Sequence, residues 1–237
     1  MNKTKIDWTD LSWNPVTGCL HGCDYCYARR MAKRLAGRAG YPQDKPFQPT
    51  FHEDKIYQPL HKKKPSKIFV CSMGELFGWW VDETWQNRVM WTIRMAPQHT
   101  FLLLTKDPAT LAAYSGSAYH SNVPPLPSNL WVGASIESRA ALQRLSNLQL
   151  VNHPNKFISF EPLLGDVTKD PFFNLHGIGW IIIGSMTGPG ATRANVFDAY
   201  NLCKAARAAG IPVFVKENMD DLWSRGDPPK EFPVGFP

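Results

Sequence analysis

The sequence has no long hydrophobic run, no internal repeat of fixed period and no low-complexity tract. Its longest apolar stretch, around residues 180–184, is far too short to span a bilayer. The first ten residues are polar and lack the apolar centre of a signal peptide. Hydrophobic residues make up 43% of the chain, which excludes a disordered tail. We therefore expect a globular, cytoplasmic protein with no membrane partner.

Cysteine is scarce and unevenly placed. The chain has five cysteines, and three of them fall within the segment 19–26. This crowding does not resemble the disulfide framework of a secreted protein, and in a reducing compartment it indicates metal or redox chemistry. Cys71 and Cys203 lie in apolar segments, so we expect both to be buried structural thiols.

Acidic residues are outnumbered by basic ones. The chain carries 26 Lys and Arg against 20 Asp and Glu, a formal net charge of +6. Such a balance favours a polyanionic partner, nucleic acid first, although many proteins carry a few extra lysines. The 237 residues are enough for one well-buried core, so we predict a single domain over 1–237.

Short apolar runs alternate with helical patterns along the chain. Runs without polar alternation are typical of parallel strands covered on both faces. Together the pattern predicts an α/β fold with a parallel sheet, either open or closed into a barrel. The expected strands are 67–72, 100–105, 130–135, 156–160, 180–184 and 212–216, and the expected helices between them are 82–95, 138–150 and 195–209.

Two segments, at about 38–66 and 114–129, do not follow this alternation of strand and helix patterns. The first is rich in Pro, Gln, Lys and His and includes the basic run 61–64, and the second carries three prolines. We expect both to be loop insertions over one end of the sheet, because connections of this length usually carry function or are poorly ordered.

The strongest motif is the spacing C-x3-C-x2-C formed by Cys19, Cys23 and Cys26. In a [4Fe–4S] cubane each iron is bound by a thiolate, so three cysteines leave the fourth iron open to an exogenous ligand. A zinc site of three cysteines and His21 is the alternative. It is the weaker interpretation, because His21 lies between two of the cysteines, where tetrahedral closure is awkward.

This spacing resembles the motif of the radical S-adenosylmethionine (SAM) superfamily. The resemblance implies that the amino and carboxylate groups of SAM fill the open iron site. It also implies that an external electron donor reduces the cluster, which cleaves SAM to methionine and a 5′-deoxyadenosyl radical. In that superfamily the residue before the last cysteine is usually aromatic and lies near the adenine, and Tyr25 fits. The implied fold is a partial (β/α)6-type parallel barrel.

Further segments resemble a phage- and prophage-associated three-cysteine family of radical-SAM-like proteins. The likeness extends from about residue 4 to 218, through Thr4–Asp10, Trp13–Cys19, Ile68–Met73, Leu104–Lys106 and Phe160–Gly165. Some phage radical SAM proteins are linked to hypermodification of DNA thymine bases, and others are related to DNA-lesion repair lyases. The chain departs from the family pattern at Gly184–Met186, where two glycines and a glutamate are usual, and at Asp107-Pro108, where a basic residue usually precedes the proline.

Polar residues follow several expected strands. In parallel α/β barrels, chemistry gathers at these carboxyl ends. Glu161 comes directly after a buried run, where a carboxylate is costly unless it is paired or faces a cavity. We take Glu161, Lys106 and Lys216 as candidate catalytic residues; the alternative is a structural ion pair of Glu161 with Lys216 or Lys106.

The resemblance also implies residues that bind SAM. Gly74-Glu75 match half of the Gly-Gly-Glu stretch that holds its amino group, with a helix-entry carboxylate as the alternative. Ser135 matches a polar position on the fourth strand. The full candidate set is Tyr25, Gly74, Glu75, Ser135, Glu137, Gly184 and Ser185. A glycine turn at 188–190 also allows close approach of a ligand.

The helix expected after the cysteines, at 24–35, carries Arg29, Arg30, Lys33 and Arg34. This basic face is either a solvated surface or a track for a nucleic-acid backbone.

The motif, the charge and the resemblance together predict a radical SAM enzyme that modifies or rearranges a substituted thymine base in phage DNA. A radical SAM lyase acting on DNA lesions, or an enzyme acting on tRNA or a peptide, is the second hypothesis. A zinc-bearing nucleic-acid-binding protein without catalysis is the third.

Overall fold

The computed structural model describes residues 1–116, 124–188, 190–223 and 226–236. Within these residues the main sheet has eight strands in the order β1-β2-β5-β6-β7-β8-β9-β10, and β3 pairs with β4 in a small second sheet. The main strands are β1 (Asn2–Lys3), β2 (Leu11–Trp13), β5 (Lys67–Val70), β6 (Thr100–Thr105), β7 (Leu130–Ser135), β8 (Lys156–Phe160), β9 (Trp180–Ile183) and β10 (Val213–Val215).

Every neighbouring pair from β2 to β10 is parallel, and only β1 runs antiparallel, against β2. The strands follow one another along the sheet in chain order, which is what repeated right-handed crossovers produce. The α/β class and the parallel sheet predicted from the sequence are therefore confirmed. β2, which extends the sheet beyond β5, is an element that the sequence did not reveal.

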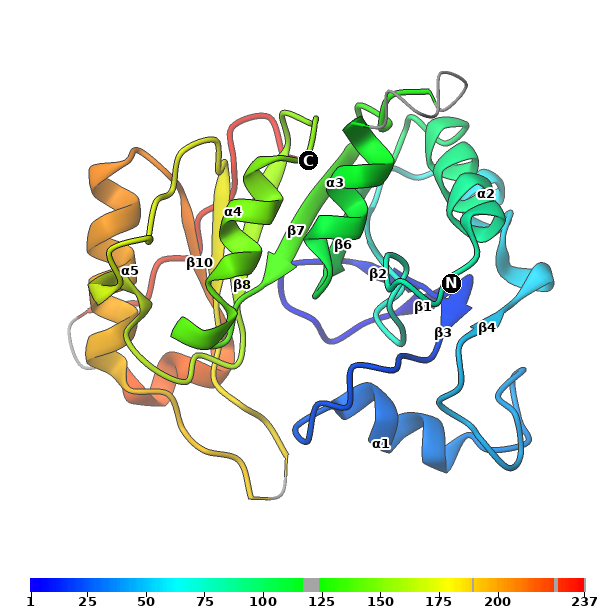
Figure 1. The fold of residues 1–237 in the computed structure, drawn as a ribbon, viewed down its shortest axis with the longest axis horizontal. Helices are drawn as coiled ribbons and strands as arrows, with labels where there is room; N and C mark the ends of the chain where they lie inside the picture. Colours follow the sequence, from blue (N-terminus) through cyan, green and yellow to red (C-terminus); the bar gives the residue numbers. More distant parts are fainter. Residues whose placement is uncertain (117–123, 189, 224–225, 237) are drawn as a thin grey trace.

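Helices cover one face of this sheet (Figure 1). They are α2 (Glu83–Arg94), α3 (Pro108–Gly116), α4 (Gln143–Gln149) and α5 (Val196–Ala208). α2, α4 and α5 lie where helices were predicted, although the first turn of the expected 138–150 helix is a separate 3-10 turn, η3 (Arg139–Ala141). α3 was not predicted. The unusual pair Asp107-Pro108 starts it, because Asp107 accepts a hydrogen bond from the Thr110 amide (3.2 Å) and proline suits the first helical position.

Alternate strand residues face two separate apolar cores. One lies between the sheet and the helices and includes Val70, Leu103 and Ile181. The other, on the opposite face, is mostly aromatic, and we call it the aromatic core; its buried members are Trp8, Phe69, Leu102, Phe157, Trp180, Ile182 and Phe214, with Phe232 and Phe236 packed against them. Burial on both faces explains why the strands read as continuous apolar runs.

The two predicted insertions differ in how they are built. Segment 38–66 is packed, since it contains β4 (Thr50–Phe51), which pairs with β3 (Val16–Thr17), and the short turns η1 (Glu53–Lys55) and η2 (Gln58–His61). The second, 114–129, begins inside α3, and its residues 117–123 lie outside the described residues. In the described part of the chain, every helix is too short or too polar to cross a bilayer.

Candidate functional site

A cavity of about 410 Å³ opens at the carboxyl ends of the parallel strands. Its lining combines polar residues that follow β5 to β10 with the loop that carries the three cysteines. Trp8 and Phe69 of the aromatic core also line it, so this core forms the apolar base of the cavity. A largely apolar hollow with a few polar groups is the usual form of a ligand site.

The loop 18–26 forms one wall of the cavity. Cys19, Cys23 and Cys26 all line it as free thiols. The loop starts at Gly18, whose φ is +87° and where an added Cβ would lie 2.2 Å from the Gln48 carbonyl oxygen, so only glycine fits. The loop ends at α1 (Tyr27–Arg34), because the sulfur of Cys26 accepts a hydrogen bond from the Arg29 amide (3.4 Å).

The thiols and the neighbouring histidine are groups of this loop that could bind a metal centre. Burial raises the pKa of Cys19 to about 12, so binding a metal centre would displace its proton. Among the described residues, no group of three or more His, Cys, Asp and Glu side chains is placed to hold one metal ion. A cubane needs no such convergence, because each thiolate binds a different iron. His21, the fourth ligand of the zinc alternative, instead lies with Nε2 3.4 Å from Glu75 Oε2 and its ring against Trp80.

A polar network ties the cysteine loop to the ends of β6 and β7. The hydroxyl of Tyr25 donates to Glu137 (2.8 Å) and receives a hydrogen bond from Lys106 (2.6 Å). Glu137 also accepts from Lys106 (3.1 Å) and, through its other oxygen, from Arg144 (2.7 Å). Burial, followed by the hydrogen bond to Glu137, raises the pKa of Tyr25. Burial acts against ionisation of Glu137 too, but the charges of Lys106 and Arg144 outweigh it and lower its pKa.

Glu75 is buried beneath the cysteine loop, with only 4% of its surface exposed. Oε1 accepts hydrogen bonds from the Phe77 amide (3.0 Å) and the Thr105 hydroxyl (2.8 Å), and Oε2 accepts one from the Lys106 amide (2.9 Å). These bonds compensate the burial of its charge. Gly74 is required by packing, because a Cβ there would approach the backbone of Thr17 to 2.9 Å.

The cavity also holds an ion pair. Lys216 Nζ lies 2.5 Å from Glu161 Oε1, so the pairing expected as the alternative to catalysis is present, with Lys216 and not with Lys106. Gly184 lies beneath both side chains, where a Cβ would be 3.0 Å from Lys216 and 3.1 Å from Glu161. The glycine therefore admits these side chains close to the β9 backbone.

Two serines, Ser185 and Ser135, also line the cavity. Ser185 is held by Asn218, which accepts from its amide (3.1 Å) and donates to its carbonyl (2.8 Å), while its hydroxyl accepts from the Ala194 amide. The carbonyl of Ser135 accepts from Arg144 (2.9 Å).

The structure brings the predicted site residues to one place. Eleven of the thirteen line the cavity: Cys19, Cys23, Tyr25, Cys26, Gly74, Glu75, Lys106, Ser135, Glu161, Ser185 and Lys216. The other two, Glu137 and Gly184, contact lining residues. Sequence reasoning missed Arg144 and Asn218, which act through contacts between segments far apart, and Tyr27 and Cys71, which line the cavity. Cys71 and Cys203 are buried, as predicted.

We expect Glu137→Gln to lower the free energy of unfolding by about 2 kcal/mol at pH 7, because Lys106 and Arg144 lose their carboxylate partner. Since the folded pKa of Glu137 lies below that of an unfolded glutamate, the stabilisation is complete above about pH 4.3 and disappears as pH falls through the folded pKa. Urea unfolding of both proteins between pH 7 and about pH 3.5 measures this.

The matched control is Glu53→Gln, which removes the carboxylate from the exposed pair Glu53–Arg88. Solvent screens that pair, so its removal should change stability little at any pH. Equal effects of the two substitutions would contradict a structural role for the Tyr25–Glu137 network.

A family model described as a protein of unknown function, DUF5131, matches residues 3–224. This chain belongs to the DUF5131 family. The description assigns the family no activity. No protein of curated function matches the sequence.

One solved structure similar to this DUF5131 chain is a spore photoproduct lyase complexed with dinucleoside spore photoproduct. The TM-score is 0.50 at 13% sequence identity, and the match covers 78% of this chain and 58% of the lyase chain. The likeness at this identity is one of fold, and the chain spans less than two thirds of the lyase. It confirms a mixed α/β fold with a parallel sheet of this kind.

Proposed function

We propose that this protein is a radical SAM enzyme that holds a [4Fe–4S] cluster on Cys19, Cys23 and Cys26. The observation that carries the proposal is the placement of these three cysteines, in C-x3-C-x2-C spacing, on the wall of one cavity at the carboxyl edge of a parallel sheet. In this proposal the sheet is a partial (β/α)6-type barrel. The similarity of fold to a spore photoproduct lyase supports it.

When bound and reduced by an external donor, the cluster and SAM supply a 5′-deoxyadenosyl radical. The residues of the chain bind SAM and the substrate and orient them. Tyr25 is hydrogen-bonded to Glu137 and Lys106, and these bonds fix the cysteine loop in position on the cavity wall. Glu75 Oε2 accepts a hydrogen bond from the Lys106 amide, has His21 Nε2 at 3.4 Å, and retains a lone pair for an ammonium group.

Ser135 and Ser185, which also line the cavity, offer hydrogen-bonding groups for the polar parts of SAM. The Glu161–Lys216 pair supplies a carboxylate and an ammonium group at hydrogen-bonding distance. We propose that this pair contacts the substrate, because both of its members line the cavity that the three cysteines also line. Either group can hold a proton for exchange with a bound base.

We propose that the substrate is a substituted or hypermodified thymine base in phage DNA, which is modified or rearranged after it leaves the base stack. The net charge of +6 suits a polyanion. A lyase acting on a DNA lesion is the second candidate, favoured by the dinucleoside ligand in the similar structure. Both candidates place a nucleobase against the Glu161–Lys216 side of the cavity.

The decisive experiment is electron paramagnetic resonance of the anaerobically reconstituted, dithionite-reduced protein, with and without SAM. We expect a reduced [4Fe–4S] signal that shifts when SAM is added, since SAM would occupy the open iron. Well-folded protein that gives no cluster signal and contains zinc would overturn the proposal in favour of a binding scaffold.

A further inference from the structure

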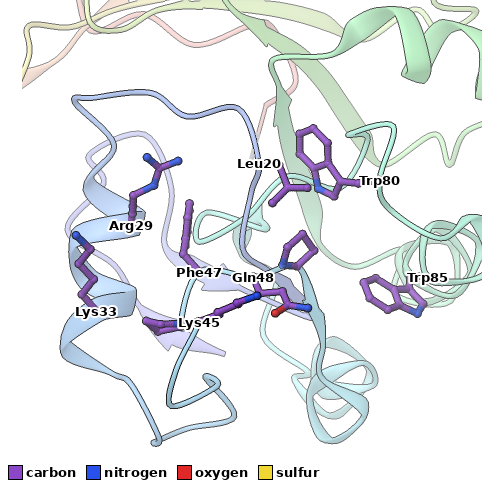
Figure 2. Close-up of a pocket in the computed structure, with 10 residues that line it drawn as sticks. Leu20, Arg29, Lys33, Lys45, Phe47, Gln48, Trp80 and Trp85 are labelled. Atoms are coloured by element: carbon purple, nitrogen blue, oxygen red, sulfur yellow. The ribbon is translucent and has the colours of Figure 1, made fainter.

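A second hollow, of about 650 Å³, lies on the other side of the cysteine loop, and we call it the side pocket. Figure 2 shows α1 residues Arg29 and Lys33 along one side of it and Trp80 and Trp85 along the other. Leu20, from between the first two cysteines, also lines it. The proposed function makes no use of this pocket.

The side pocket is directly connected with the cluster-bearing wall. Phe47 lines both the side pocket and the cavity. Its carbonyl accepts a hydrogen bond from the Cys19 amide (3.2 Å), and the next residue, Gln48, packs against Gly18. Anything bound in the side pocket therefore lies against the loop that holds the cysteines.

The charge of the side pocket has one sign. Arg29, Lys33 and Lys45 line it, and none of the lining residues is acidic. Within the described part of the chain, no ion pair engages these three cations; Arg29 instead stacks over the Phe47 ring at 5.6 Å. Three unpaired cations in one hollow favour an anionic occupant.

Aromatic rings make up much of the remaining surface. Phe47, Trp80 and Trp85 line the side pocket, and Trp79, whose ring lies 5.6 Å from that of Trp80, is 78% exposed. Cations that follow a phosphate backbone together with aromatic rings that stack on bases are the features by which proteins hold single-stranded nucleic acid.

We infer that the side pocket binds a single strand of DNA, with phosphates on Arg29, Lys33 and Lys45 and bases against Trp80 and Trp85. The role of such binding rests on the proposed function: the side pocket would hold the strand beside the cysteine loop while a base from the same strand enters the cavity. Its binding chemistry depends only on the residues of the side pocket.

The test is fluorescence anisotropy of the full chain with a labelled oligothymidylate of about ten nucleotides, over a range of salt concentrations. The double variant Lys33→Glu/Lys45→Glu should bind at least about tenfold more weakly at low salt. Its log–log salt dependence should be shallower by about 1.4, because two phosphate contacts are lost on a single strand. Trp85→Ala should weaken binding about tenfold through lost stacking.

Two matched substitutions serve as controls. Lys204→Glu changes an exposed lysine on α5, and Trp91→Ala removes a half-exposed tryptophan of α2. Both should leave oligothymidylate affinity within about twofold of the wild type. If the controls weaken binding as much as the side-pocket variants, if polyglutamate competes as well as the oligonucleotide, or if the wild type does not bind, the inference is wrong.

The inference and the proposed function fail separately. Lys33→Glu/Lys45→Glu should retain the cluster and the SAM-dependent shift of its paramagnetic signal, because neither lysine lines the cavity. If DNA binding depends on the side pocket but the protein holds no cluster, the proposed function is refuted and the inference stands. If the cluster responds to SAM but DNA binding does not depend on the side pocket, the inference is refuted and the proposed function stands.

Discussion

Replacing any one of Cys19, Cys23 or Cys26 by alanine should reduce iron–sulfur content and SAM cleavage by about 100-fold or more. Loss of residues that merely support a metal ligand already costs up to about 100-fold, and a missing ligand should cost at least that. The fold should survive, because the three thiols lie on a partly exposed loop that contributes little to either core. Iron and sulfide analysis after anaerobic reconstitution, with 5′-deoxyadenosine formation, measures both losses.

Cys203→Ala is the matched control for the cysteine variants. Its thiol is buried on α5, away from the cavity, and burial raises its pKa to about 11. This variant should retain the cluster. If it loses as much iron as the loop variants, or if a loop variant retains the full cluster, the three cysteines are not the ligand set.

Trp180→Ala should lower the free energy of unfolding by about 3–5 kcal/mol, as expected when a large ring is removed from a packed core. Trp180 is fully buried and lies at the centre of the aromatic core, with ring contacts to Trp8 and Phe157 among others. Its indole also donates a hydrogen bond to the Glu231 carbonyl (2.9 Å), which the variant leaves unpaired. Urea unfolding followed by circular dichroism measures the change.

Phe172→Ala provides the comparison, because this ring is 78% exposed. Removing it should change stability by no more than about 0.5 kcal/mol. If the two substitutions have similar effects, the aromatic core does not stabilise the sheet as its burial indicates.

The strands were predictable because both faces of the sheet are buried. The runs that became β6, β7 and β8 match their predicted bounds, since each is mostly apolar and Ser159 is the one polar residue inside them. β2 was missed because its three residues, Leu11–Trp13, are too few to show a pattern, and it is defined by its pairing with β1 and β5. α3 was missed because its cap, Asp107-Pro108, was read as a departure from a family motif.

The position of the site was predictable from the sequence, but the pairing of its charged side chains was not. Strand ends in a parallel sheet meet at one edge, so residues such as Ser135, Glu161 and Lys216 had to lie near one another. Which carboxylate meets which cation depends on side-chain directions that one sequence does not reveal. Lys106 was considered as a partner for Glu161, but it bonds Glu137 and Tyr25.

The aromatic core joins segments from opposite ends of the chain. Trp8 packs on Trp180, Phe232 and Phe236 pack on the same ring, and Asp7 accepts a hydrogen bond from the Glu217 amide (2.9 Å). Contacts so distant in sequence raise the contact order and slow folding. During synthesis the aromatic core beneath the cavity is therefore fully covered only after residues 232 and 236 have left the ribosome.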